Sequence, residues 1–228
     1  MSLTPDAINL PSTAARNTSG TTIPTILDER AEVGNLTRNI VIQSADDSLW
    51  QQQAFGGQVM IMGNSSEAVI DGVEMRRMGQ AGKFGRYPLH FHNMSYDSTG
   101  KQLSDATATF KNSTISNSSQ RCFVIHGSNG VKIQNNICYD IKGHAVFLED
   151  GVERRNLIEN NLVLRVRTSL YGESAPSTCP MQSIYDGPPE RNCALLKHER
   201  RDGQPSGFWL VNPDNIVRGN VAADISGQ

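Results

Sequence analysis

The chain has 228 residues, a hydrophobic content of 37% and a formal net charge of −2. This length allows one large β domain or two small ones. The near-neutral charge argues against a general polyanion binder, and we expect no nucleic-acid partner. Because no run of about 18 apolar residues occurs, we expect no membrane span. Residues 1–25 are polar and carry no hydrophobic leader, so we expect no signal peptide in this sequence.

The first part of the chain differs from the rest in its composition. Residues 1–28 are expected to form an N-terminal arm or partial coil, and residues 29–228 the main domain. Residues 37–43 and 56–62 are rich in apolar, β-forming side chains, so each predicts a strand. No stretch shows a sustained helical period, which predicts an all-β fold.

A repeat becomes visible after residue 68. Each unit contains a short apolar-alternating strand, a corner with Asn or Gly, and a second strand, at residues 69–74, 109–114, 132–137, 157–162 and 216–221. The spacing is 23 residues from Asn112 to Asn135 and 25 from Asn135 to Asn160. Such a period indicates a solenoid. Because helical and leucine-rich consensus patterns are absent, we predict a parallel β-helix.

Asparagine suits the corners of this β-helix because it tolerates a left-handed backbone and its amide can bond to the Asn of the next coil. We expect one ladder of corner residues at Asn112, Asn135 and Asn160, and a second at Asn136, Asn161 and Asn220.

The four cysteines divide into two pairs. Cys179 and Cys193 fall in a long insertion, residues 169–206, which a disulfide between them would pin; this pairing is left open. Cys122 and Cys138 fall on different segments of one repeat and are expected to be buried thiols. No CxxC pair occurs, so a zinc ribbon is not expected.

Four short strands carry most of the chemically active side chains. They end in His90-Phe91-His92, Val124-Ile125-His126, Phe147-Leu148-Glu149 and Leu210-Val211-Asn212. In each strand one parity is apolar, which predicts the core side, and the other parity forms an outer face. If the strands stack in register, then His92, His126, Glu149 and Asn212 form one column.

Further polar residues flank this column. His90 lies beside it and Asp150 follows the third strand, while Arg121 and His144 precede their strands at matching positions. Arg86 and Tyr87 precede the first strand.

Three interpretations of the column remain open. His92, His126 and Glu149 could bind a divalent metal ion, since two imidazoles and a carboxylate form a common ligand set. The same groups could supply a general acid and base to a sugar, with Arg86 or Arg121 binding a substrate carboxylate. They could also form a structural ladder of hydrogen-bonded side chains. A slip of one residue in the alignment would turn these side chains into the core.

Several separated motifs also carry a family resemblance. They are Glu32-Val33-Gly34, Leu36-Thr37-Arg38-Asn39-Ile40-Val41-Ile42, Met78-Gly79-Gln80, Gly85-Arg86-Tyr87-Pro88-Leu89-His90-Phe91-His92, Arg121-Cys122, His126-Gly127-Ser128-Asn129-Gly130, Gly143-His144, Glu149-Asp150-Gly151, Phe208-Trp209 and Asn212-Pro213. Together they resemble the family of the cell-migration-inducing hyaluronan-binding protein, transmembrane protein 2 (the cell-surface hyaluronidase) and the fibrocystin-like proteins. The resemblance covers residues 29–228. It implies a right-handed parallel β-helix of the pectin-lyase type and an extracellular or cell-surface location.

The resemblance leads to two functional hypotheses. The first is a carbohydrate-active β-helix, a hydrolase or a lyase, that degrades an acidic glycosaminoglycan such as hyaluronan. The second is a non-catalytic glycan-binding or scaffolding module. We expect a monomer. Under the first hypothesis the candidate catalytic residues are His90, His92, His126, His144, Glu149 and Asp150, and the candidate substrate-binding residues are Arg86, Tyr87, Arg121 and Asn212.

Overall fold

A computed structural model describes residues 8–9, 26–27, 32–81, 83, 85–167 and 205–226. The chain divides into two compact units, Met1–Gly34 and Asn35–Gln228. In the first unit, strands β1 (Ile8–Asn9) and β2 (Ile26–Leu27) pair antiparallel. The second unit contains the repeats and the candidate site, and the predicted loop at 169–206 with Cys179 and Cys193 lies almost wholly outside the described residues.

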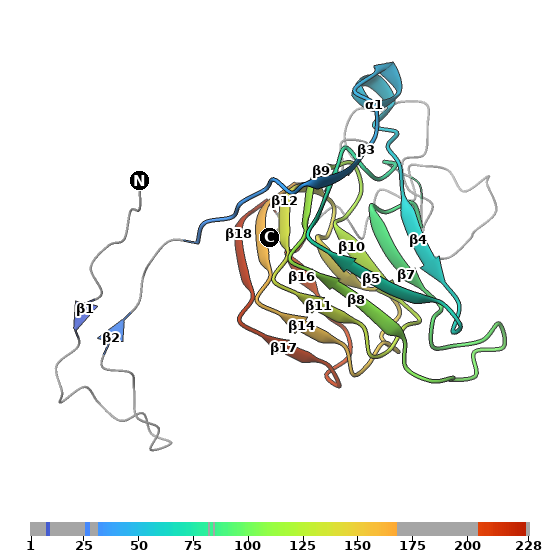
Figure 1. Cartoon of the computed structure of the whole chain (residues 1–228). Coiled ribbons are helices and arrows are strands. Elements are labelled where there is room, and N and C mark those ends of the chain that lie inside the picture. The colour runs from blue at the N-terminus through green and yellow to red at the C-terminus, as the bar shows by residue number, and fades with distance from the viewer. Residues whose placement is uncertain are drawn as a thin grey trace, which may run out of the picture. The chain divides into compact units, whose positions relative to one another are not determined.

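The second unit is a parallel β-helix built from three parallel sheets (Figure 1). Successive coils place one strand in each sheet. The first sheet contains β4 (Val59–Met62), β7 (Leu89–His92), β10 (Phe123–His126), β13 (Val146–Leu148) and β16 (Phe208–Trp209). The second sheet contains β5 (Glu67–Asp71), β8 (Thr107–Lys111), β11 (Lys132–Gln134), β14 (Leu157–Glu159) and β17 (Ile216–Arg218).

The third sheet has one further strand. It contains β3 (Ile40–Gln43), β6 (Val73–Arg76), β9 (Thr114–Ser118), β12 (Ile137–Lys142), β15 (Leu162–Arg167) and β18 (Val221–Ile225). A short helix, α1 (Ser48–Gln53), follows β3; it begins after Asp47, whose carboxylate accepts from the first-turn amides. None of the helices in the described part of the chain is long and apolar enough to cross a membrane.

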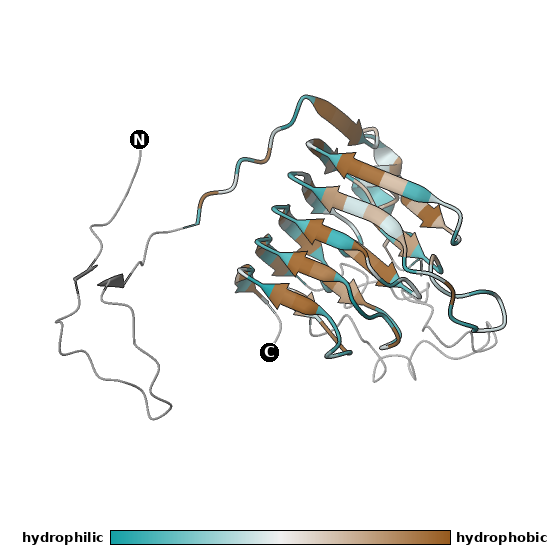
Figure 2. Cartoon of the chain, turned by 60° about the horizontal axis from the view of Figure 1, so that its bottom comes forward, coloured by the Kyte–Doolittle hydropathy of each residue, from teal (hydrophilic) through white to brown (hydrophobic). Residues whose placement is uncertain are grey.

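The predicted repeat register is confirmed in the second sheet. Lys132 pairs with Thr109 on one side and with Leu157 on the other, and Leu157 pairs with Ile216. Hydrophobic side chains therefore recur at equivalent positions on successive strands, as Figure 2 shows by colour. The buried side chains among them form one continuous interior core.

The polar corners also follow the prediction. Asn136 donates its side-chain amide to the Oδ1 of Asn161 (3.1 Å), and Asn161 donates to the Oδ1 of Asn220 (2.9 Å). Asn136 and Asn161 are buried, so this ladder satisfies polar groups inside the protein. At the neighbouring corner Asn112, Asn135 and Asn160 all adopt a positive φ, between 50° and 56°.

The sequence did not reveal a further ladder one corner away. Asn129, Asn156 and Asn215 each accept a backbone amide of a neighbouring coil on their side-chain oxygen. This third set of amides fixes the turn that follows the first sheet, so it helps to hold the strand ends where the candidate site lies.

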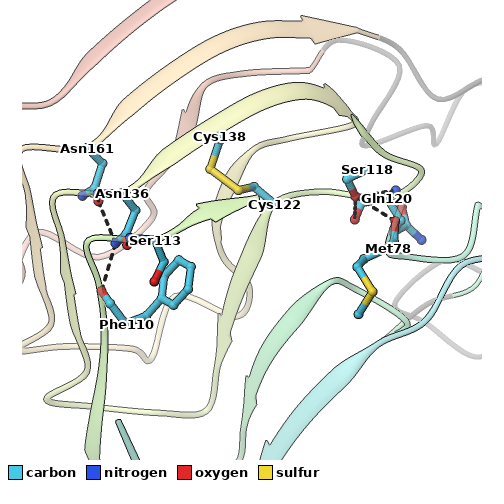
Figure 3. Close-up of a disulfide and its surroundings, with 9 residues drawn as sticks. All are labelled: Met78, Phe110, Ser113, Ser118, Gln120, Cys122, Asn136, Cys138 and Asn161. Carbon is cyan, nitrogen blue, oxygen red and sulfur yellow. Dashed lines mark hydrogen bonds between the residues drawn. A yellow bond between two sulfur atoms is a disulfide. The ribbon is translucent and has the colours of Figure 1, made fainter. Parts of the chain in front are cut away.

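The prediction that Cys122 and Cys138 are free thiols is wrong, because they form a disulfide. Figure 3 shows the bond between the segment before β10 and strand β12. The two residues are 16 apart in sequence, but they face the same interior from two walls of one coil, with a Cα–Cα distance of 6.0 Å. The disulfide therefore cross-links a single coil next to the start of β10.

The predicted register of the fourth strand is also wrong, by one residue. Val146 pairs with Phe208 and Phe147 with Trp209, so Phe208 takes the core position that was expected for Trp209. Trp209 belongs to the outer parity and is 40% exposed. Continuing this register places Asn212 level with Asp150 rather than with Glu149.

Candidate functional site

The first sheet places two imidazoles side by side at the ends of adjacent strands. His92, the last residue of β7, pairs in register with His126, the last residue of β10. The Nδ1 atoms of the two rings are 2.9 Å apart. Because the distance suits a hydrogen bond, one of these nitrogens carries a proton and the other presents its lone pair.

Asp150 sets which nitrogen of His126 is protonated. Its Oδ2 lies 2.8 Å from the Nε2 of His126. A carboxylate only accepts hydrogen bonds, so Nε2 of His126 carries the proton and Nδ1 is left with a lone pair directed at His92. The side chain of His126 is 16% exposed and that of Asp150 is 41% exposed, so solvent and ligands reach the Asp150 end of this pair more easily.

His90 lies two residues before His92 and therefore projects from the same face of β7. The centroid of its ring is 4.9 Å from that of His92 and 5.9 Å from that of His126. Its Nδ1 lies 3.2 Å from the carbonyl oxygen of Gly85, to which it donates, and its buried Nε2 has no hydrogen-bond partner among the described residues. Burial, together with the neighbouring His92, lowers the pKa of His90 to about 3, so the ring is neutral. We call His90, His92 and His126 the imidazole row.

Glu149 and Asp150 follow β13 and point into different environments. Glu149 is 5% exposed, and neither of its carboxyl oxygens has a hydrogen-bond partner among the described residues. Burial raises the pKa of Glu149 above its ordinary value, although the nearby His126 and Arg121 oppose this shift. The chain thus places a buried carboxyl group whose pKa is raised next to an exposed carboxyl group.

Glu153 is the residue that the sequence did not single out. It is fully buried, and its carboxylate accepts from the backbone amides of Gly127 (2.9 Å), Gly151 (2.8 Å) and Asp150 (3.1 Å). These amides directly follow His126 and surround Asp150. Glu153 therefore ties together the two strand ends that carry the His126–Asp150 pair. The positive-φ Gly151, two residues earlier, is the sequence signal of this turn.

Arg121 and Tyr87 lie at the opposite end of the same strands. The Arg121 guanidinium is 3.7 Å from the ring centre of Phe147 and 4.7 Å from that of Tyr87, and it donates to the Tyr87 hydroxyl (2.9 Å). Arg121 is only 2% exposed and Tyr87 is buried. Arg86 is exposed. Of the two arginines predicted to bind a substrate carboxylate, Arg86 is the one that solvent reaches in this structure.

His144 and Asn212 are not brought into the imidazole row. His144 lies level with Arg121, where its Nδ1 accepts from the backbone amide of Ser206 (3.1 Å) and its ring packs against Trp209. Asn212 donates its amide to the carbonyl of Gly151 (2.8 Å), next to Asp150. The four residues that do converge are His90, His92, His126 and Asp150, with Glu149 behind them.

The imidazole row is the group of described residues best placed to hold a metal ion. One ring nitrogen from each of His90, His92 and His126 lies within 4.8 Å of the others. The predicted metal set contained Glu149 in place of His90, and Glu149 does not belong to this group. The geometry therefore offers three imidazole ligands, with carboxylates in a second layer.

Comparisons with known proteins agree with this architecture. A family model described as the CEMIP beta-helix matches residues 54–228. The human (Homo sapiens) Cell surface hyaluronidase CEMIP2 is 36% identical over 217 residues, which cover 86% of this chain and 15% of that protein. The mouse (Mus musculus) Cell migration-inducing and hyaluronan-binding protein is 31% identical over 215 residues, again with 86% and 15% coverage.

A relative from a distant organism is similar to the same extent. Protein rliB of Dictyostelium discoideum is 34% identical over 194 residues, which cover 85% of this chain and 16% of that protein. The chain therefore spans about 15% of the length of the curated relatives that it matches.

Proposed function

The chain belongs to the CEMIP β-helix family, and on that premise we propose that it binds an acidic polysaccharide such as hyaluronan and cleaves it by acid–base chemistry at the end of the first sheet. The relatives named as hyaluronidase and hyaluronan-binding protein supply the substrate class. Their names also support an extracellular or cell-surface site of action.

The observation that carries this proposal is the pair of neighbouring carboxyl groups in opposed environments. Glu149 is buried and its pKa is raised, whereas Asp150 is exposed and bound to His126 at 2.8 Å. Cleavage of a glycosidic bond commonly uses one carboxyl group that gives a proton and one carboxylate that accepts a proton or attacks. In this assignment Glu149 holds the proton, Asp150 is the accessible carboxylate, and Glu153 positions both through the backbone.

Arg86 supports an acidic substrate. It is exposed and lies in the segment that precedes β7, whereas His92 and Asp150 lie at the far end of the first sheet's strands. Its guanidinium would bind a carboxylate of the substrate before β7, with cleavage at the other end of the strands.

The test is product analysis with the purified chain. Hyaluronan would be incubated with the wild type, with Asp150→Asn and with a control, Lys132→Ala, which changes an exposed charge on the second sheet. We expect shortened chains from the wild type and control, and little cleavage by Asp150→Asn. New reducing ends without ultraviolet absorbance indicate hydrolysis, and unsaturated ends indicate elimination. Binding without any shortening would overturn the cleavage proposal and favour a glycan-binding module.

A further inference from the structure

We propose that His90, His92 and His126 form a binding site for one transition-metal ion of the Zn²⁺ type. Three imidazoles, with a fourth position left for water or substrate, are a normal ligand set for such ions. The existence of this site does not depend on glycan cleavage. Its role rests on the proposed function: the bound ion would take a substrate oxygen as its fourth ligand and leave proton transfer to Glu149 and Asp150.

His90 is prepared as a ligand by its own surroundings. The Gly85 carbonyl accepts from Nδ1 of His90, which fixes the ring in the form whose Nε2 has a free lone pair. That Nε2 is buried and unpartnered among the described residues, although leaving a buried polar nitrogen unsatisfied is unfavourable. A metal ion is a partner that would satisfy this nitrogen.

His126 is prepared in the opposite tautomer. Asp150 accepts from its Nε2, so Nδ1 keeps a lone pair on the side that faces His92. Metal-binding histidines usually donate their second ring N–H to a carboxylate or a backbone carbonyl, which orients the ring and increases its basicity. His126 has the carboxylate type of partner and His90 has the carbonyl type.

His92 completes the triangle. Its Nδ1 is 2.9 Å from Nδ1 of His126, and its Nε2 is 3.4 Å from the side-chain amide of Asn93. In the metal-free protein the proton between the two Nδ1 atoms belongs to His92, because Nδ1 of His126 has none. Metal binding through Nδ1 requires His92 to change tautomer, so that the proton moves to its own Nε2 and Nδ1 presents its lone pair.

The distances suit an ion after small side-chain rotations. Metal–nitrogen bonds of about 2.0–2.1 Å in a tetrahedral site put two ligand nitrogens about 3.4 Å apart. One ring nitrogen from each of the three histidines lies within 4.8 Å of the others, and the Nδ1 atoms of His92 and His126 are 2.9 Å apart. Nitrogen ligands favour Zn²⁺ and similar ions over Ca²⁺ and Mg²⁺, which prefer oxygen.

The experiment measures metal binding directly, with no need for activity. The purified chain would be treated with a chelator, dialysed against Zn²⁺, and analysed for bound metal and for melting temperature; Co²⁺ would serve as a spectroscopic probe of coordination. The variants are His92→Ala, which removes a partly exposed ligand, and Asp150→Asn, which removes the partner of His126. His198→Ala is the matched control. It also removes one histidine, but leaves the imidazole row and His144 unchanged.

We expect one equivalent of Zn²⁺ in the wild type and in His198→Ala, with a raised melting temperature and a visible spectrum for the Co²⁺ form. Affinity should fall more than about 100-fold in His92→Ala and about 10- to 100-fold in Asp150→Asn. No stoichiometric metal in folded wild-type protein, or equal binding by folded His92→Ala, would overturn the site. Zinc binding without cleavage would reject the proposed function and keep the metal site. Cleavage that persists in metal-free protein would keep the proposed function and overturn the catalytic role of the ion.

Discussion

The buried asparagine ladder and the imidazole row are both stacks of polar side chains on successive coils, yet they differ in how well they are satisfied. The amide of Asn161 donates to Ile133 and Asn220, and its oxygen accepts twice from Asn136. In contrast, Nε2 of His90 and both oxygens of Glu149 are buried without partners among the described residues. Because native proteins rarely leave buried polar groups unsatisfied, we propose a role in stability for the ladder and a role in chemistry for the row.

The largest effect that separates the two stacks should be on cleavage. His126→Ala removes the partner of Asp150 and one proposed metal ligand, and we expect the rate per folded molecule to fall on the order of 10³-fold, about 4 kcal/mol in activation free energy. Its unfolding free energy should change by less than about 1 kcal/mol because the side chain is partly exposed. Rates would be measured on hyaluronan with His198→Ala as the control; unchanged turnover would contradict the assignment.

The second effect is on stability. Asn161→Ala removes the acceptor of the buried backbone N–H of Asn136 and the donor to the Ile133 carbonyl. The side-chain amide of Asn136 loses one of its two acceptors and keeps the Phe110 carbonyl. We expect a loss of about 3 kcal/mol in unfolding free energy. Denaturant unfolding would measure this loss. Gln134→Ala, a partly exposed polar change on β11, serves as the control and should stay within about 0.5 kcal/mol. Equal stability of Asn161→Ala and Gln134→Ala would show that the ladder does not stabilise the fold, and would contradict the proposed difference between the ladder and the imidazole row.

Substitution of Glu153 should affect both stability and cleavage. Its carboxylate accepts from three backbone amides, and Glu153→Gln turns one accepting oxygen into a donor that faces them. We expect a stability loss of about 2 kcal/mol and a lower cleavage rate per folded molecule. The partly exposed Glu159, which binds Arg218 at 2.6 Å, offers a matched substitution, Glu159→Gln, for which we expect a smaller loss of stability. Similar losses for both variants would argue against a special role of Glu153.

The smallest expected effect is a gain in stability, produced by Glu149→Gln. The pKa of Glu149 is raised in the folded protein, so the unfolded chain loses this proton first and folding loses stability as the pH rises from about 4.5 through the folded pKa. Glu149→Gln keeps a neutral side chain of the same shape, so we expect a gain of about 1 kcal/mol at neutral pH and none below pH 4. Unfolding at several pH values would measure this, and an equal effect at all pH values would contradict it.

The sequence was sufficient for the fold wherever a corner residue marked the repeat. Asn112, Asn135 and Asn160 share the left-handed backbone that asparagine tolerates, so their spacing gave the correct register. The fourth strand follows the long insertion, which interrupts the regular spacing of the repeats. Its residues from Phe208 to Val211 are all apolar, so apolar and polar side chains do not alternate there. Its register could therefore not be read from the pattern.

The candidate site was predicted in part for a similar reason. Register alone brought His92 beside His126, because both end their strands. The disulfide was missed because Cys122 and Cys138 meet across one coil, and a comparison of successive coils does not show that contact. Three features could not be read from the sequence: the orienting role of Asp150, the turn held by Glu153 and the burial of Arg121. These residues lie outside the strands, where side chains no longer alternate between the two faces of a sheet.

The most direct test is the protonation of individual histidine nitrogens in the intact chain. Nitrogen-15 NMR of the histidine-labelled protein at neutral pH, assigned with single His variants, reports which ring nitrogens carry protons. We predict a bare Nε2 on His90 and a bare Nδ1 on His126, with the His126 pattern changed by Asp150→Asn. Rapidly exchanging, ordinary tautomer mixtures on both rings would show that the imidazole row is not pre-organised and would contradict the account.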